Sequence, residues 1–386
     1  MQNFDFYNPT HILFGKGRIA DLNKLIPIDA KVLLLYGGGS IKKNGIFDEV
    51  ISALGNRDIS EFSGIEPNPT YENLLNAVEI VKTKKIDFLL AVGGGSVIDS
   101  TKFIAAAALI ETGEPWSILE KRGTNIGKAL PFGTILTLPA TGSEMNSGGV
   151  VTRRSINAKM SFNSRHCFPK FSILDPTKTY TLPIRQIGNG AVDAFIHVME
   201  QYLTYPVNSP VQDRFAEGLL KTLIEEGPKA LIEPENYDVR ANLMWCASMA
   251  LNGVISTGVP QDWATHMIGH ELTALHGLDH AQTLAIILPS MLRIRKEAKR
   301  EKLLQYAERV WDLRVGNDDA RIDAAINLTQ AFFEQMGVKT HLSDYALGSE
   351  CITPILSALE NHRMVTLGER RDVTLEVSRQ VLELSL

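Results

Sequence analysis

The sequence predicts an α/β domain over residues 1–183, followed by an all-helical domain over residues 184–386. In the first part, short apolar runs alternate with helix-length segments, which is the sequence form of repeated βαβ units. In the second part, β-branched runs disappear and long segments with helical spacing take over. A chain of 386 residues is long enough for two domains with separate cores.

Three apolar runs, at residues 31–36, 87–92 and 134–138, are expected to be buried parallel strands. Small or Gly-rich residues follow each run, and helix-length segments such as residues 71–83 come next. Open α/β sheets bind ligands at the carboxyl edge of their strands. The loops after these runs are therefore the predicted binding region of the first domain.

The second domain is expected to consist of amphipathic and buried helices. Apolar residues recur with helical spacing at residues 211–226, 239–254, 264–275 and 318–336. The pair Gly227-Pro228 and the segment 258–260 contain Gly and Pro, and both are expected to end helices.

Three Gly-rich segments are candidates for binding a nucleotide. Gly15-Lys16-Gly17 begins a G-x-G-x-x-A match, but no acidic residue stands about 20 positions further on at a second strand end. The run of Gly93, Gly94, Gly95 and Ser96 directly follows an apolar run and leads into a helix, where backbone N–H groups can approach a diphosphate. The run of Gly37, Gly38, Gly39 and Ser40 has the same placement one strand earlier. Two such edges indicate a two-part ligand, and tight turns without a ligand are the alternative.

Five of the nine histidines cluster in the second half of the chain, at positions 197, 266, 270, 276 and 280. Asp193 and His197 are four residues apart in a helical stretch, so they lie on one helix face. His266 and His270 repeat this spacing, and His280 would enter from a neighbouring segment. Imidazoles with a carboxylate and no thiolate suit Zn(II) or Fe(II). Spacing alone does not choose between His270 and His280 as the partner of His266.

Composition and charge exclude several other classes. The net charge of -5 offers no electrostatic excess for binding nucleic acid. Cys167, Cys246 and Cys351 form no CxxC pattern, which disfavours a disulfide framework and a thiolate zinc site. No stretch approaches the apolar length of a membrane span, and no signal sequence is evident, so a cytoplasmic protein is expected.

A nucleotide-binding half joined to a helical, metal-binding half is the layout of a dehydrogenase that uses the ion as a Lewis acid. No tyrosine has lysine four positions later, so the Tyr-x3-Lys dyad of short-chain dehydrogenases is missing. The cysteine ligands of medium-chain zinc alcohol dehydrogenases are missing too.

Over essentially the whole chain, the residues resemble the iron-containing (group III) alcohol dehydrogenases. The motifs that carry the resemblance are Phe14-Gly15-Lys16-Gly17, Pro67-Asn68-Pro69, Gly93-Gly94-Gly95-Ser96 with Asp99 and Lys102, residues 137–144, Asp193-x3-His197, and His266-x3-His270 with His280. Residues 36–40 and 261–266 resemble the branch of NADPH-dependent butanol dehydrogenases and broad aldehyde reductases. The resemblance implies a Rossmann-like first domain and a helical second domain.

The resemblance also implies roles for particular residues. It assigns the metal to Asp193, His197, His266 and His280, and it places His270 near nicotinamide and substrate as a candidate catalytic residue. It implies cofactor contacts at Asn68, Thr137, Leu138, Thr141 and Lys159, besides the two glycine runs with Ser40 and Ser96. Asp99 joins this set as a residue that contacts the cofactor or only orients the loop. Family members that use NAD commonly have Asp where Gly38 stands, so NADP(H) is the expected cofactor.

The resulting hypothesis is a metal-dependent, NADPH-linked reductase of small aliphatic aldehydes, expected to be a homodimer with no nucleic-acid or membrane partner. Three alternatives stay open at this point: an NAD-linked polyol dehydrogenase, a metal-dependent lyase of the dehydroquinate synthase-like fold, and a nucleotide sensor without enzymatic activity. The lyase needs a cluster of basic side chains for a phosphorylated substrate, and residues 261–280 contain none.

Overall fold

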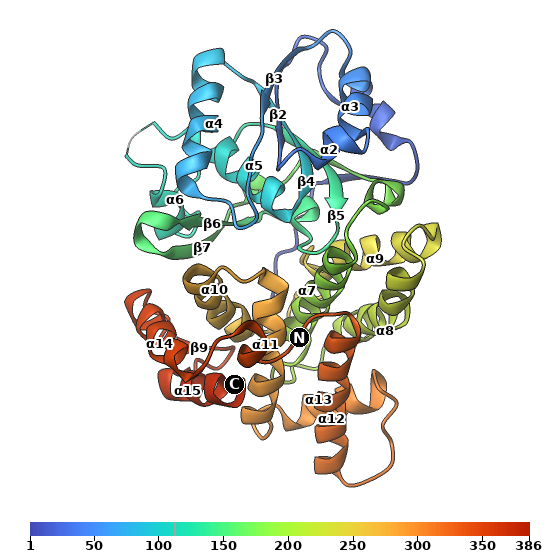
Figure 1. Ribbon diagram of the computed structural model, residues 1–386, viewed down its shortest axis with the longest axis vertical. Coiled ribbons are helices and arrows are strands. Elements are labelled where there is room, and N and C mark those ends of the chain that lie inside the picture. Colours follow the sequence, from blue (N-terminus) through green and yellow to red (C-terminus); the bar gives the residue numbers. More distant parts are fainter. Residues whose placement is uncertain (112) are drawn as a thin grey trace. The chain divides into compact units, whose positions relative to one another are not determined.

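The computed structural model describes residues 1–111 and 113–386, which form two compact units (Figure 1). The sheet unit consists of Tyr7–Leu182 and Glu235–Met244, and the helical unit consists of Met1–Phe6, Pro183–Pro234 and Trp245–Leu386. Two short segments do not belong to the same unit as the sequence next to them. Residues 1–6 belong to the helical unit, and residues 235–244 belong to the sheet unit.

The sheet unit is built on a six-stranded sheet in which every neighbouring pair of strands is parallel. The three strands predicted from apolar runs are confirmed as β2 (Lys31–Tyr36), β4 (Phe88–Gly94) and β5 (Phe132–Leu138). Across the sheet, the order is β1 (His11–Phe14), β8 (Phe171–Leu174), β5, β4, β2 and β3 (Asp58–Phe62).

Alternate residues of the strands enter two separate cores on the two faces of this sheet. On one face, Val32 and Leu34 pack with α1 (Leu22–Leu25) and α3 (Ile46–Leu54). On the other face, Leu33 and Leu35 pack with α4 (Tyr71–Lys84) and α5 (Gly95–Ala107). Because both faces are covered, the strands read as continuous apolar runs rather than as alternating patterns.

The remaining elements of the sheet unit are short. An antiparallel ribbon of β6 (Gly148–Arg153) and β7 (Ala158–Asn163) follows β5 in the chain. The helices α2 (Ser40–Lys43) and α6 (Ser117–Glu120) are each a single turn.

The helical unit confirms the helices expected from spacing, with one small addition. Its longer helices are α7 (Ile184–Tyr202), α8 (Pro210–Ile232), α9 (Tyr237–Ala250, of which the first part belongs to the sheet unit), α10 (Ala264–His276), α11 (His280–Ile294), α12 (Arg300–Arg309), α13 (Asp318–Gln335), α14 (Ile352–Asn361) and α15 (Leu375–Leu384). A two-stranded ribbon of β9 (Thr366–Leu367) and β10 (Val373–Thr374) is the departure from an all-helical unit.

The expectation that Gly227-Pro228 ends a helix is wrong, because α8 continues through both residues to Ile232. Pro228 costs the helix one backbone hydrogen bond. Gly227 is buried, and a Cβ built on it would lie 3.1 Å from the Sδ atom of Met336, just beyond the end of α13. Burial of this face against α13 therefore outweighs the local preference of the Gly-Pro pair to stop the helix.

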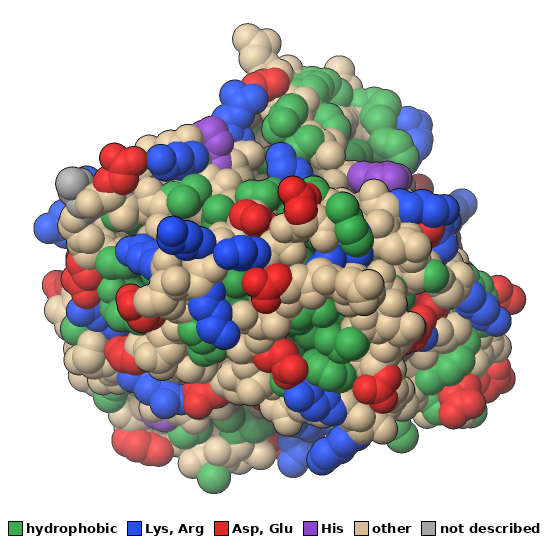
Figure 2. All heavy atoms as spheres, turned by 90° about the horizontal axis from the view of Figure 1, so that it is seen from above, with side chains coloured by type: hydrophobic (Ala, Val, Ile, Leu, Met, Phe, Trp, Pro, Cys, Tyr) green, Lys and Arg blue, Asp and Glu red, His purple; other side chains and the backbone are tan. Residues whose placement is uncertain are grey.

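On the face drawn in Figure 2, Lys and Arg side chains are interspersed with Asp and Glu side chains. This mixture agrees with the small net charge of -5. Among the helices of the described residues, none combines the length and the apolar character that crossing a bilayer requires.

Candidate metal and nucleotide sites

Helix α7 carries Asp193 and His197 on one face, and Glu200 lies one turn further along. Every residue of this helix from Ile187 to Tyr202 is buried. A helix that is buried all round has no solvent face for polar residues, so each polar side chain on it needs a partner. The buried Asp and His residues of α7 are therefore the first candidates for a site.

Two further histidines reach the same place from α10 and α11. His266 lies in the first turn of α10, and His280 is the first residue of α11. A capping box fixes the start of α11, since Asp279 N–H donates to Gln282 Oε1 at 3.0 Å while the Asp279 side chain accepts from the third helical residue. This cap sets the position from which His280 projects.

Asp193, His197, His266 and His280 each offer a ligand atom, and these four atoms lie within 4.8 Å of one another. The Nε2 atoms of His197 and His280 are both 3.8 Å from Asp193 Oδ1. The rings of His197 and His266 stack with centroids 4.8 Å apart. Asp193, His197 and His266 are buried, and His280 is half-buried. Spacing in the sequence left open whether His270 or His280 accompanies His266. In the structure, His280 is the one that lies in the cluster.

The protonation of His197 fits metal binding. Burial lowers the pKa of His197 to about 4, although the Asp193 carboxylate opposes this shift. At neutral pH the imidazole is therefore neutral and keeps the lone pair that a metal ligand needs. Three imidazoles with one carboxylate form a donor set that suits Zn(II) or Fe(II), so these residues fit a divalent ion.

His270 lies one turn beyond His266 on α10 and is buried. Its ring centroid is 5.3 Å from that of His280 and 6.3 Å from that of His266. His270 therefore borders the cluster without being one of the four grouped residues.

Sequence reasoning missed Glu200, which is buried beside His266. Glu200 Oε2 contacts His266 Nδ1, and Glu200 Oε1 accepts from Thr265 N–H at 2.7 Å. Burial raises the pKa of Glu200, and the nearby Asp262 carboxylate raises it further. The signal that could have found this residue is the spacing Asp193-x3-His197-x2-Glu200, which places three side chains on neighbouring turns of one helix.

In the sheet unit, the two predicted glycine runs end adjacent strands. Tyr36 of β2 pairs with Val92 of β4, so Gly37 and Gly93 follow at the same carboxyl edge. The helices after these two strands, α3 and α5, lie on opposite faces of the sheet. Adjacent strands whose connections leave on opposite faces form a topological switch point, which is where open α/β sheets bind ligands.

The glycines at positions 94 and 95 allow close packing against the end of β5. A Cβ at Gly94 would lie 3.0 Å from the Cβ of Leu138, and a Cβ at Gly95 would clash with the side chain of Thr141. Leu138 and Thr141, two of the predicted cofactor residues, are thus brought beside Gly94 and Gly95. The glycines therefore have a packing role of their own, whether or not a nucleotide binds.

Asp99 and Lys102, both on α5, belong to a buried network of hydrogen bonds with the segment after β5. Asp99 accepts from Ser143 Oγ at 2.6 Å and from Val150 N–H at 2.9 Å. Lys102 Nζ donates to Ser143 Oγ, Asn146 Oδ1 and the carbonyl of Gly148. Burial raises the pKa of Asp99 and lowers that of Lys102 to about 8. Both oxygens of Asp99 hold protein groups, so this carboxylate orients the loop after β5.

Two other predicted cofactor residues contact each other. Lys159 Nζ donates to Asn68 Oδ1 at 2.9 Å, which joins β7 to the segment before α4. Asn68 has a φ of 56°, in the left-handed region, and a buried Lys159 holds its side chain.

Gly38 lies in open space at the end of β2, since a Cβ built on it would meet nothing within 4 Å. Ser40 begins α2 and is exposed. Two lysines, Lys42 and Lys43, follow Ser40 on α2, and Lys42 Nζ pairs with Glu61 Oε2 at 2.9 Å and lies over the ring of Phe47. The Lys42 ammonium lowers the pKa of Glu61. Lys42 is thus held by groups of the protein, whereas the described residues form no ion pair with Lys43.

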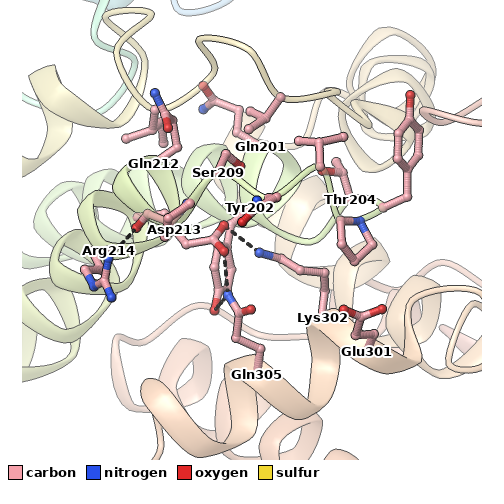
Figure 3. A pocket seen from close by; sticks show the side chains of 18 of the residues that line it. Gln201, Tyr202, Thr204, Ser209, Gln212, Asp213, Arg214, Glu301, Lys302 and Gln305 are labelled. Carbon is pink, nitrogen blue, oxygen red and sulfur yellow. Dashed lines mark hydrogen bonds and ion pairs between the residues drawn. The ribbon is translucent and has the colours of Figure 1, made fainter. Parts of the chain in front are cut away.

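A separate cavity of about 320 Å³ lies within the helical unit (Figure 3). It is lined by the end of α7, the start of α8 and part of α12. Two of its charged groups pair with each other, since Lys302 Nζ donates to Asp213 Oδ1 at 2.6 Å, and Gln305 Nε2 donates to Asp213 Oδ2 at 3.0 Å. The four clustered ligand residues are not among its lining residues.

The sheet unit has glycines at the switch point of a doubly wound parallel sheet, and the helical unit has an Asp-His cluster. These features are typical of a protein that binds a nucleotide and a divalent metal ion. The chain matches the family model of iron-containing alcohol dehydrogenases over residues 9–176, and the C-terminal model of the Fe-containing alcohol dehydrogenase family over residues 188–375. The chain belongs to the iron-containing alcohol dehydrogenase family, which confirms the resemblance seen in its motifs.

Several relatives match over nearly the full chain. The NADPH-dependent aldehyde reductase YqhD of Escherichia coli is 61% identical over 99% of both chains. A probable NADH-dependent butanol dehydrogenase of Bacillus subtilis is 42% identical over 100% of both chains. A crystal structure of YqhD superposes with a TM-score of 0.99, at 60% identity, covering 100% of this chain and 99% of that one.

Proposed function

We propose that this protein is a metal-dependent, NADPH-linked aldehyde reductase that transfers hydride between NADP(H) and small aliphatic aldehydes or primary alcohols. The single observation that carries the proposal is the buried cluster of Asp193, His197, His266 and His280 in a member of the iron-containing alcohol dehydrogenase family. The name of the YqhD relative, at 61% identity, supports both the reduction of aldehydes and the use of NADPH.

The metal, Fe(II) or Zn(II), would be held by Asp193 and His197 from α7, His266 from α10 and His280 from α11. When bound, the divalent ion supplies Lewis acidity and NADPH supplies the hydride for reduction of the carbonyl group. Three of the four side chains are buried, which limits the access of water, and burial keeps His197 neutral. A site with little water strengthens the electrostatic interactions within it.

The cofactor would lie at the switch point between β2 and β4. Gly37, Gly38, Gly39 and Ser40 follow β2, and Gly93–Ser96 span the end of β4 and the start of α5, with Leu138 and Thr141 beside them. Thr137, which precedes Leu138 in β5, belongs to the proposed set as well. The first backbone N–H groups of α5 supply hydrogen bonds for a diphosphate. Asn68 and Lys159 complete the proposed set. Asp99 contributes by holding Ser143 and the start of β6 in place.

NADPH is proposed over NADH because Gly38 leaves open space where an acidic residue would repel a 2′-phosphate. Lys43 and the hydroxyl of Ser40 are the candidate partners for this phosphate.

His270 is proposed as the residue that delivers the proton to the developing alkoxide, either directly or through water. It is buried next to the ring of His280, and an imidazole is the side chain most often used for proton transfer.

These placements give each half of the chain its own proposed role. Residues 1–183 would form the dinucleotide-binding domain, and residues 184–386 would form the metal and substrate domain.

We also propose a cytoplasmic homodimer. The three cysteines are buried free thiols, which fits a reducing compartment. Closed twofold dimers are the commonest assembly of soluble enzymes.

The experiment that tests this proposal is a spectrophotometric assay of NADPH oxidation with butanal, together with identification of the product. Stoichiometric formation of butanol supports the proposed function. A protein that leaves NADPH unconsumed, with its metal bound, contradicts it and favours a lyase or a nucleotide sensor. Faster turnover of a polyol with NAD would favour a polyol dehydrogenase.

A further inference from the structure

The contact between Glu200 and His266 has a consequence for how the metal is held. Glu200 and His266 come from different helices, α7 and α10, and both side chains are at least nine-tenths buried. Glu200 Oε2 meets Nδ1 of the imidazole. A proton must lie between these two atoms, so Nδ1 cannot offer a lone pair to an ion.

The other oxygen of the same carboxylate holds the backbone at the start of α10. Glu200 Oε1 accepts from Thr265 N–H at 2.7 Å. The N-cap residue of α10, Trp263, makes no side-chain cap, and its φ is 63°, in the left-handed region. Asp262 Oδ1 accepts from Ala264 N–H at 2.9 Å, so the first two N–H groups of α10 are satisfied by two carboxylates. A carboxylate at a helix N-terminus stabilises it through the helix dipole.

From these contacts we infer that Glu200 is a positioning residue for the metal site, which presents Nε2 of His266 to the ion and fixes the start of α10 against α7. One side chain thus sets both the rotation of the His266 ring and the position of the backbone that carries it. Carboxylates that accept from the outer nitrogen of a metal-bound histidine raise its basicity, and their loss typically weakens metal affinity about 10- to 100-fold.

The chain offers a matched control in a second contact between a buried carboxylate and an imidazole, in which the histidine is half-buried. Glu271 is 1% exposed, lies on the same helix α10, and its Oε1 is 2.8 Å from Nδ1 of His362. His362 is outside the four clustered residues. Replacing Glu271 therefore removes a buried carboxylate that contacts an imidazole, from the helix that carries His266, without touching a proposed ligand.

The test is the zinc dissociation constant, measured by competition with a chromophoric chelator, for the full-length parent, Glu200→Gln and Glu271→Gln. Zinc affinity is expected to fall about 10- to 100-fold in Glu200→Gln and to stay at the parent value in Glu271→Gln. Glu200→Asp, which keeps the charge, should recover part of the loss. Unchanged affinity in Glu200→Gln, or equal losses in Glu200→Gln and Glu271→Gln, would overturn the inference.

If Glu200→Gln does not fold, the parent protein itself provides the test. Nitrogen-15 NMR of labelled histidines in the zinc-loaded protein should show His266 protonated on Nδ1 and coordinated through Nε2. Coordination through Nδ1 would overturn the role of Glu200.

This inference rests on the proposed metal site, and the two can fail separately. A parent that binds no zinc or iron contradicts the proposed function. A parent that binds zinc, beside a Glu200→Gln variant that binds it equally well, overturns only the role of Glu200.

Discussion

His266 and His270 occupy equivalent places on successive turns of α10, but their surroundings differ. His266 belongs to the cluster whose ligand atoms lie within 4.8 Å, and its Nδ1 contacts Glu200. His270 borders this cluster beside His280. Two histidines with the same spacing in the sequence therefore receive different proposed roles, one as a ligand and one in proton transfer.

Replacing His266 by Ala is expected to reduce the metal content from about one ion per chain to nearly none, because one of four ligands is lost. His270→Ala is expected to keep the ion and to lower turnover on the order of 100-fold or more, as loss of a proton donor does. Elemental analysis and steady-state rates on the same preparations measure both effects. Equal loss of metal in the two variants would show that His270 is itself a ligand.

Gly38 is a suitable residue at which to test cofactor choice, because a Cβ there meets nothing within 4 Å. Gly38→Asp should weaken NADPH binding about tenfold or more, since a carboxylate would face the 2′-phosphate. The ratio of kcat/KM for NADPH and NADH should therefore fall or reverse. Gly38→Ala is the control and should keep the parent ratio. An unchanged ratio in Gly38→Asp would place the discriminating residue elsewhere.

At the residue scale, the sequence predicted which side chain types form the site but not all of their partners. The i, i+4 pairs on α7 and α10 were visible as helical spacing. The choice of His280 over His270 needed the family resemblance, because it depends on how α11 starts beside α10. Glu200 was missed because Glu is common on helices. The pairing of Lys42 on α2 with Glu61 on β3 depends on β3 lying beside β2, which spacing does not reveal.

Among the elements, the packing of α7 depends on glycine at a position where no side chain fits. A Cβ at Gly188 would clash with the backbone carbonyl of Met336, at the end of α13. Gly218 lies on α8, and a Cβ there would meet nothing within 4 Å. The two glycines therefore offer a matched pair for separating packing from helix propensity.

Gly188→Ala should lower the free energy of unfolding by about 1–3 kcal/mol, because overpacking forces the helices apart. Gly218→Ala should raise it by roughly 0.5–1 kcal/mol, since Ala is the better helix former. Urea unfolding followed by circular dichroism measures both changes. A stabilised Gly188→Ala variant would mean that α13 yields easily at Met336.

The elements themselves were largely predictable, and the exceptions have a common cause. The strand β2 has the predicted bounds, because a fully buried strand is a continuous apolar run between turn residues. The end predicted at Gly227-Pro228 was wrong, because burial against α13 is a tertiary effect that local preferences do not contain. The small ribbon of β9 and β10 is too short to produce a pattern of its own.

At the scale of the whole molecule, the two proposed sites lie in different compact units. The ligand residues belong to the helical unit, and both glycine runs belong to the sheet unit. The sequence indicated this division through the change from βαβ units to helices. It gave no sign that residues 1–6 and 235–244 would belong to the opposite units, because such exchanges depend on contacts distant in the chain.

Since each unit has its own core, removal of the metal should leave NADPH binding largely intact. The dissociation constant of NADPH, measured by fluorescence titration, should be similar in the metal-loaded and the chelated protein. Loss of NADPH binding on chelation would show that the metal helps to form the cofactor site.

The central claim is that the cluster of Asp193, His197, His266 and His280 holds the ion on which aldehyde reduction depends. The most direct measurement is the rate of NADPH oxidation with butanal as the chelated protein is titrated with Zn(II) or Fe(II). The rate should be near zero without metal, rise in proportion to added ion and level off at about one ion per chain. Full activity in protein that elemental analysis shows to be free of metal would contradict the claim.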